Sequence, residues 1–215
     1  MQTVSKTLRL IRKQAQSFTV PSVTEIAFAH DPYLVLISCI LSLRTKDKTT
    51  LEASRRLFAV ADNPKAMSKL SKSLLQKLIY PVGFYRNKSK VILDVSNIIV
   101  NDFCGRVPPR REDLLAFKGV GPKTANLVLG LGFGIPAICV DTHVHRISNR
   151  LGWVKTHEPV ETEEALKKIV PRDYWIELNT LLVAFGQNIC VPVSPFCSRC
   201  FVQQSCKKEG VRQQR

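Results

Sequence analysis

Apolar residues recur along most of the chain at intervals of three or four positions, which is the spacing of a helix that buries one face. One such run lies between Val91 and Ile99, and a second lies between Trp175 and Phe185. Because this periodicity dominates the chain, it predicts an all-α fold class.

The best candidate for a strand is the apolar stretch from Ile135 to Val140. It is short, Pro136 is its second residue, and no partner run follows it with the turn signal of a hairpin. We therefore expect an extended linker here.

Turn signals divide the middle of the chain. Pro occurs in each of the short segments 30–32, 62–64, 81–83 and 107–109, accompanied by Asp, Asn, Gly or a second Pro. Because Pro lacks a backbone N–H and interrupts a helix, these segments predict compact helices of modest length between them.

The composition allows an ordinary buried core. The 215 residues are 45% hydrophobic, which is enough for one large domain or two small ones. The 32 Lys and Arg residues against 17 Asp and Glu residues give a formal net charge of +15, which is typical of chains that bind a polyanion such as nucleic acid. Charge alone is equally compatible with a basic, soluble surface, so the motifs must decide.

No apolar run approaches the roughly 20 residues that a membrane helix needs. The polar N-terminal segment MQTVSKTLRLIRKQ also lacks the apolar core of a secretory signal. We therefore expect a cytoplasmic protein associated with the nucleoid. In a reducing compartment cysteines are rarely paired as disulfides, so a dense group of them indicates a metal site.

The segment Leu114–Gly132, LLAFKGVGPKTANLVLGLG, reads as two helices joined by a tight turn at Gly119–Val120–Gly121. Pro122 suits the first position of the second helix. Backbone amides at the turn and at this helix start, beside Lys123 and Thr124, can bind a phosphate. The segment matches the helix-hairpin-helix pattern, which grips the DNA backbone without reading base sequence. Taken alone, an ordinary corner between helices is as good an interpretation.

A carboxylate follows directly after the apolar linker, in the segment Val140–Arg146, VDTHVHR. Asp141 stands where it could cap a helix that begins there, and spacing alone favours that role. A capping side chain can still take part in catalysis. We expect His143 and His145 to lie on the helix face, and we assign neither a primary role.

Four cysteines gather near the C-terminus with six, two and five residues between them: Cys190, Cys197, Cys200 and Cys206. Four thiolates at this density suit either an iron–sulfur cluster or a structural zinc ion, and the spacing by itself leaves both open. The other three, Cys39, Cys104 and Cys139, stand mostly among apolar neighbours and are expected in the core.

Taken together, the motif GVGPKTA at 119–125, the motif VDTHVHR and the cysteine array closely resemble the endonuclease III family of base-excision DNA glycosylases, in their order and in their separations. The resemblance extends from about Leu8 to Cys206. It implies a six-helix domain over 25–135 that contains the helix-hairpin-helix. It also implies a second helical domain, formed by 1–24 and 136–215, that carries the cysteines, with DNA held in a cleft between the two.

The resemblance also assigns the chemistry. In the family, the lysine that follows the hairpin turn is the nucleophile, and here this residue is Lys123. The role is chemically suitable, because a lysine attacks the sugar carbon C1′ as a neutral amine and a helix N-terminus favours that form. Asp141 would be its essential partner, stabilising positive charge on the sugar and helping to move protons. The cysteine spacing matches the family's ligands residue for residue, so the resemblance implies a [4Fe-4S] cluster with a structural role.

Two loops of the family open the duplex and fill the space that the extruded base leaves. The matching segments are Leu41–Asp47, which places Arg44 in the gap-filling position, and Val82–Tyr85, which places Phe84 in the wedging position. The family more often has Gln and an aliphatic residue there. Arg can donate hydrogen bonds to an orphaned base and Phe can stack on one, so both substitutes are chemically able.

The resemblance thus implies a repair enzyme that excises oxidised pyrimidines from double-stranded DNA and nicks the strand by β-elimination. DNA contacts would come from Arg44, Phe84, the 119–121 turn, Lys123 and Thr124. We expect a monomer whose ligand is damaged or abasic duplex DNA, with no membrane partner. Two alternatives remain open: a glycosylase for mismatched or alkylated bases, and a non-catalytic DNA-binding module that carries a cluster.

Overall fold

The computed structural model describes residues 2–215, with side chains from Thr3 onward. Over these residues it consists of helices and connecting segments without a strand, which confirms the predicted all-α class. The stretch 135–140 has no regular structure, as expected of a linker. Within this part of the chain, no helix is both long enough and apolar enough to cross a membrane.

The residues cluster into two compact units, and the chain visits one of them twice. One unit runs from Ser22 to Ile135. The other combines the N-terminal residues up to Pro21 with the segment Pro136–Arg215. The 135–140 linker therefore begins where the chain leaves the first unit.

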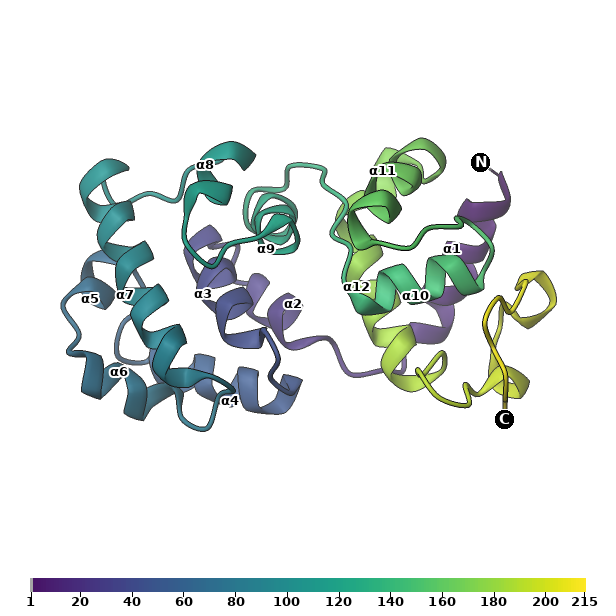
Figure 1. Cartoon of the computed structure of the whole chain (residues 1–215), viewed down its shortest axis with the longest axis horizontal. Coiled ribbons are helices and arrows are strands. Elements are labelled where there is room, and N and C mark those ends of the chain that lie inside the picture. The colour runs from purple at the N-terminus through teal and green to yellow at the C-terminus, as the bar shows by residue number, and fades with distance from the viewer. Residues whose placement is uncertain (1) are drawn as a thin grey trace. The chain divides into compact units, whose positions relative to one another are not determined.

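The unit Ser22–Ile135 contains eight α-helices and one π-helical turn among its described residues (Figure 1). In chain order these are α2 (Ser22–Ala27), α3 (Pro32–Ser42), α4 (Asp47–Phe58), α5 (Pro64–Ser68), α6 (Lys72–Ile79), α7 (Tyr85–Asp102), α8 (Arg111–Ala116), α9 (Pro122–Leu127) and η1 (Val128–Gly132, the π-helical turn). The predicted run of apolar residues around Val91 lies within α7, so the helical interpretation of this segment is confirmed.

Two of the predicted turn segments act as helix starts. Asp31 is the N-cap of α3, and its carboxylate accepts hydrogen bonds from the backbone N–H groups of Tyr33 and Leu34 at 2.7 and 3.3 Å. Asn63 is the N-cap of α5 and accepts from the N–H of Ala66 at 2.9 Å. In both helices Pro follows the cap, where its missing N–H costs nothing because that group has no partner within a helix.

Helix α3 is the central element of this unit. Its residues from Val35 to Leu41 are buried on every side, and it packs against α2, α4, α7, α9 and η1. A helix that is apolar all round belongs in the middle of a bundle. The helix also buries the hydroxyl of Tyr33, which lies 2.6 Å from Ser96 Oγ of α7, and burial raises the pKa of this tyrosine.

The second unit is built from helices far apart in the sequence. Its elements are α1 (Gln2–Ala15), α10 (Thr142–Arg150), α11 (Pro159–Ile169), η2 (Arg172–Tyr174), α12 (Trp175–Asn188), η3 (Cys197–Arg199) and η4 (Gln203–Ser205). The purple α1 lies beside the yellow-green α12 in Figure 1, so the N-terminal helix completes a bundle formed by the C-terminal part.

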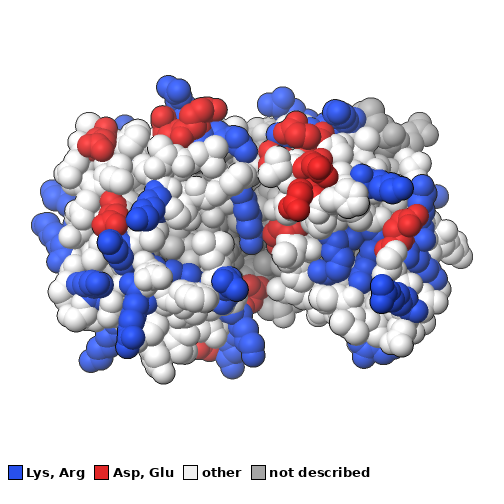
Figure 2. Space-filling view, viewed as in Figure 1, with Lys and Arg blue, Asp and Glu red and all other residues white. Residues whose placement is uncertain are grey.

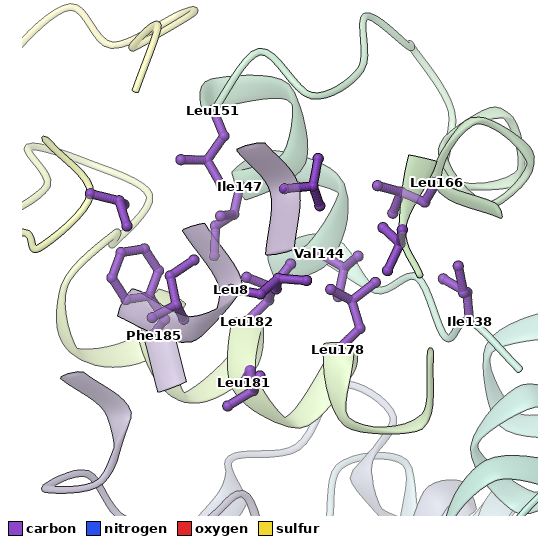
Figure 3. Close-up of a cluster of buried hydrophobic side chains, with 14 of the residues drawn as sticks. Leu8, Ile138, Val144, Ile147, Leu151, Leu166, Leu178, Leu181, Leu182 and Phe185 are labelled. Atoms are coloured by element: carbon purple, nitrogen blue, oxygen red, sulfur yellow. The ribbon is translucent and has the colours of Figure 1, made fainter. Parts of the chain in front are cut away.

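The core of this unit joins α1, α10, α11 and α12 (Figure 3). Leu8 of α1 and Leu182 of α12 are completely buried in it, and Ile138 of the linker contributes a third fully buried side chain. The N-terminal helix is therefore held by apolar packing against residues more than 100 positions away.

The prediction that three of the cysteines are core residues is partly wrong. Cys39 and Cys139 are buried, as expected, but Cys104 is exposed. The chain turns sharply just after α7, with Cys104 in the left-handed region at φ +52° and the N–H of Gly105 bonded to the carbonyl of Ile99 at 2.8 Å. Apolar neighbours in the sequence do not bury a residue at the tip of such a turn.

Candidate active site

The turn between α8 and α9 has the geometry of a tight hairpin. Gly119 adopts φ +83°, and a Cβ atom added there would lie 3.0 Å from Val91 Cγ1 of α7. The backbone angle therefore favours glycine here, and a larger residue would also have to displace the Val91 side chain. The N–H of Val120 closes the turn onto the carbonyl of Phe117 at 3.0 Å.

The five residues of this hairpin that are predicted to contact DNA differ in their exposure to solvent. Gly119 and Gly121 are exposed and Lys123 is partly exposed, whereas the side chains of Val120 and Thr124 are buried. Val120 and Thr124 expose only 6% and 2% of their surface, so they offer little area for contact with DNA. The exposed glycines leave the turn accessible to a phosphate.

Lys123 is the second residue of α9, directly after Pro122. Burial raises the pKa of the Cys39 thiol on α3 to about 12. The positive charge of Lys123 acts in the opposite direction but has the smaller effect. Lys123 thus stands next to the buried centre of its own unit rather than on an outlying loop.

Asp141 is the N-cap of α10. Its Oδ1 atom accepts hydrogen bonds from the N–H groups of His143 and Val144, both at 2.9 Å. The capping role that spacing favours is confirmed. Because two bonds to a rigid helix end fix the carboxyl group, the cap also determines where this carboxylate can act.

The two histidines of this segment make contacts within their own unit. His145 Nδ1 lies 2.7 Å from Thr162 Oγ1 of α11, and His143 Nδ1 lies 3.2 Å from an Nη atom of Arg146. These contacts join α10 to α11 or brace neighbours on one helix.

Two arginines of α10 reach from the helix to the first part of the cysteine array. Arg146 donates to the carbonyl of Cys190 at 2.8 Å. Arg150, which is buried, donates to the carbonyls of Val191 at 2.7 Å and Pro192 at 2.6 Å, and it lies 3.5 Å from Cys190 Sγ. The helix that Asp141 caps therefore holds the loop that begins at Cys190. Sequence reasoning missed both arginines, because nothing in a helical run of charged residues marks which of them will be buried.

The four C-terminal cysteines line one cavity, together with Arg150, Phe185, Phe196 and several aliphatic side chains. None of the four forms a disulfide. Burial raises the pKa of Cys200 to about 11, so this thiol stays neutral unless a cation stabilises its thiolate. Among the residues that the structure describes, no three His, Cys, Asp or Glu side chains converge closely enough to hold a single metal ion.

The two loops predicted to open the duplex lie side by side in the unit Ser22–Ile135. The guanidinium carbon of Arg44 is 5.2 Å from the centre of the Phe84 ring. Both side chains are exposed, Phe84 to 59%, and both residues have left-handed backbone angles. An exposed aromatic ring with a cation beside it is suited to stacking against bases.

The comparisons with known proteins agree with this arrangement. The family described as "HhH-GPD superfamily base excision DNA repair protein" matches residues 37–172. Endonuclease III of Thermotoga maritima is 51% identical over 177 residues, which cover 82% of this chain and 83% of that protein. Endonuclease III homolog 1, chloroplastic, of Arabidopsis thaliana is 42% identical over 202 residues, and the chain spans 52% of its length.

A solved structure of a trapped endonuclease III–DNA covalent intermediate matches 96% of this chain and 95% of its own, with a TM-score of 0.84 and 30% identity. The fold and the hairpin thus define a DNA-repair protein of the helix-hairpin-helix class. The chain belongs to the HhH-GPD superfamily of base excision DNA repair proteins and, within it, to the endonuclease III family.

The cap of α10 gives a first prediction. Asp141→Ala removes both cap bonds and should lower the free energy of unfolding by about 0.5–2 kcal/mol. Asp141→Asn keeps an acceptor in the same place and should stay within about 0.5 kcal/mol of the parent. Denaturant unfolding followed by far-UV circular dichroism measures both, and equal stability of the two variants would show that the cap contributes nothing.

Proposed function

We propose that this chain is a bifunctional base-excision repair enzyme, a DNA glycosylase and abasic-site lyase that removes oxidised pyrimidines from double-stranded DNA and then nicks the strand by β-elimination. The observation that carries the proposal is a lysine at the start of α9, directly after an exposed hairpin turn, in a chain that also fixes Asp141 by capping. The relatives named endonuclease III support the same activity.

The hairpin and the positive net charge account for binding to the DNA backbone. The turn at Gly119 and Gly121 exposes backbone to a phosphate, and the surplus of cations supplies attraction that does not depend on base sequence. On the face drawn in Figure 2, Lys and Arg side chains are spread over both units, whereas the largest groups of Asp and Glu lie near α8 and α11, with smaller acidic groups elsewhere. The acidic helices are then the parts least suited to meet a phosphate.

The chemistry begins with the neutral amine of Lys123. Its nitrogen attacks C1′ of the damaged nucleotide, the bond from C1′ to the base breaks, and the base leaves with the electron pair and is protonated. The carboxylate of Asp141 stabilises the positive charge that develops on the sugar and accepts a proton from the attacking amine. Opening of the sugar ring leaves a Schiff base between Lys123 and C1′. Loss of a proton from C2′ then breaks the C3′–O bond and nicks the strand.

Extrusion of the base requires one side chain that enters the base stack and another that fills the space left by the extruded base. Phe84 is exposed and placed to enter the base stack, while Arg44 beside it carries the donors that an unpaired opposite base can accept. The adjacency of the two side chains supports these roles, because both must act on the same base pair.

The four C-terminal cysteines are proposed to hold a [4Fe-4S] cluster. They line one cavity, so one cysteine is available for each iron of such a cluster. When bound, the cluster would supply structural cohesion to the loop from Cys190 to Cys206, which Arg146 and Arg150 connect to α10.

The two units would serve as the two domains of the enzyme, 25–135 with the hairpin and 1–24 with 136–215 around the cluster. The unit boundaries at Ser22 and Pro136 support this division. Residues of both domains would contact the DNA, and the enzyme would act as a monomer. Because its substrate is chromosomal DNA, we place it in the cytoplasm in association with the nucleoid.

Borohydride trapping tests the nucleophile. Borohydride added during the reaction with abasic duplex DNA should reduce the Schiff base and leave the protein covalently attached to the strand through Lys123. Lys123→Gln should abolish trapping while DNA binding stays within about threefold, because the hairpin backbone is unchanged. Asp141→Asn should slow base release on the order of 100-fold through lost charge stabilisation. Normal trapping by Lys123→Gln would show that another amine is the nucleophile.

Metal analysis tests the cysteine site. The purified protein should be yellow-brown and contain about four iron and four sulfide per chain. Cys200→Ser should lower the iron content and weaken both DNA binding and thermal stability, because the ligated loop loses its constraint. About one zinc with no sulfide would refute the cluster, and intact DNA binding after its loss would refute the structural role.

A further inference from the structure

Lys88 is a buried lysine in the first turns of α7, with 7% of its surface exposed. Its Nζ atom donates to the carbonyl oxygen of Leu41 at 2.8 Å, to the carbonyl of Leu43, and to Thr45 Oγ1 at 3.1 Å. Three acceptors satisfy all three protons of an ammonium group. The lysine thus connects α7 to the segment that leaves the end of α3.

Burying this side chain is costly. Lysine is almost never fully buried unless it is paired, and desolvation lowers the pKa of Lys88 to about 8. All three acceptors are neutral oxygens, and the carbonyl of Leu41 belongs to the last turn of α3, where the helix dipole favours a cation. Charged hydrogen bonds to a helix end and its following loop offset the loss of water.

Thr45 makes a second connection between the same segments. Its Oγ1 atom accepts the backbone N–H of Gly83 at 3.2 Å as well as the bond from Lys88, and it lies 3.3 Å from the carbonyl of Leu43, to which its hydroxyl donates. Gly83 approaches so closely that a Cβ atom there would be 2.7 Å from the carbonyl oxygen of Arg44. The Thr45 hydroxyl is therefore the junction of two loops.

These bonds surround the two residues proposed to open the duplex. Arg44 stands between Leu43 and Thr45, and Phe84 stands between Gly83 and the start of α7. Both have left-handed backbone angles, with φ +53° and +57°, which residues other than glycine seldom adopt. Such conformations persist where surrounding contacts enforce them.

We infer that Lys88 and Thr45 are positioning residues that lock the Arg44 loop and the Phe84 loop into one unit, so that wedging and gap filling occur as a single insertion. The inference rests on the roles proposed for Arg44 and Phe84. Neither Lys88 nor Thr45 needs to touch DNA, because each acts through the backbone of the loops it holds.

Two duplexes distinguish positioning from general stability. One carries a thymine glycol opposite adenine, and the other carries the same lesion opposite a one-nucleotide gap. The second has no opposite base to separate or to satisfy, so correct insertion matters less on it. Single-turnover rates of base release are measured on both with the cluster-loaded full-length protein.

Lys88→Met keeps a chain of similar length but removes the three donors. Lys88→Met should slow base release from the paired substrate on the order of tenfold or more, because misplacement of a positioned group is costly. It should slow base release from the gapped substrate by less than about threefold. Lys90→Met, an exposed lysine on the same helix, is the matched control and should match the parent on both. Thr45→Val should repeat the selective loss and Thr45→Ser should restore the rate, so the test stands even where Lys88→Met fails to fold.

The reference variants Arg44→Ala and Phe84→Ala distinguish a failure of the positioning inference from a failure of the roles proposed for Arg44 and Phe84. Suppose that both variants release the base more slowly from the paired substrate alone, while Lys88→Met and Thr45→Val behave like the parent. The inference that Lys88 and Thr45 lock the two loops is then wrong, and the roles proposed for Arg44 and Phe84 stand. Equal losses by Lys88→Met on the two substrates would also overturn it, since they indicate a structural effect alone. If Arg44→Ala and Phe84→Ala show no selective loss, the proposed roles themselves fail.

Discussion

The first backbone N–H groups of a helix have no acceptor within the helix, and in α10 the carboxylate of Asp141 provides one. This cap acts in the unit that contains the cysteine array. It fixes the start of α10, whose buried face enters the core around Leu182 and whose arginines hold the loop that begins at Cys190. The carboxylate that we propose for the chemistry is thereby kept in place by the helix that it begins.

Each unit uses a buried cation to support a segment without regular structure. Arg150 donates to the carbonyls of Val191 and Pro192 at the start of the cysteine loop, and Lys88 donates to the carbonyls of Leu41 and Leu43 at the end of α3. Loop carbonyls that are removed from water need donors, and a long cationic side chain from a neighbouring helix can reach several of them at once. The proposed cluster loop and the proposed insertion loops are therefore anchored by the same physical device.

Much of the fold follows from local patterns. Apolar periodicity predicted α7 and α12, and the turn signals around Asp31 and Asn63 mark observed helix caps. The pattern could not predict the burial of Lys88 or Arg150, because their partners lie more than 40 positions away and only the folded chain brings them together. The prediction for Cys104 was wrong for a different reason, because apolar neighbours in the sequence do not reveal the local turn after α7 that exposes it. The hairpin, the capping aspartate and the cysteine array were recognisable because each is a short local motif.

The most direct test of the proposed activity is a product analysis on four matched duplexes that differ only in one base pair: thymine glycol opposite adenine, uracil opposite guanine, a G:T mismatch, and an undamaged pair. The released base and the new strand ends are identified by mass spectrometry. We expect free thymine glycol together with a 3′ unsaturated aldehyde end, and little base release from the other three duplexes. Release of uracil or thymine without strand cleavage, or binding without any release, would contradict this expectation.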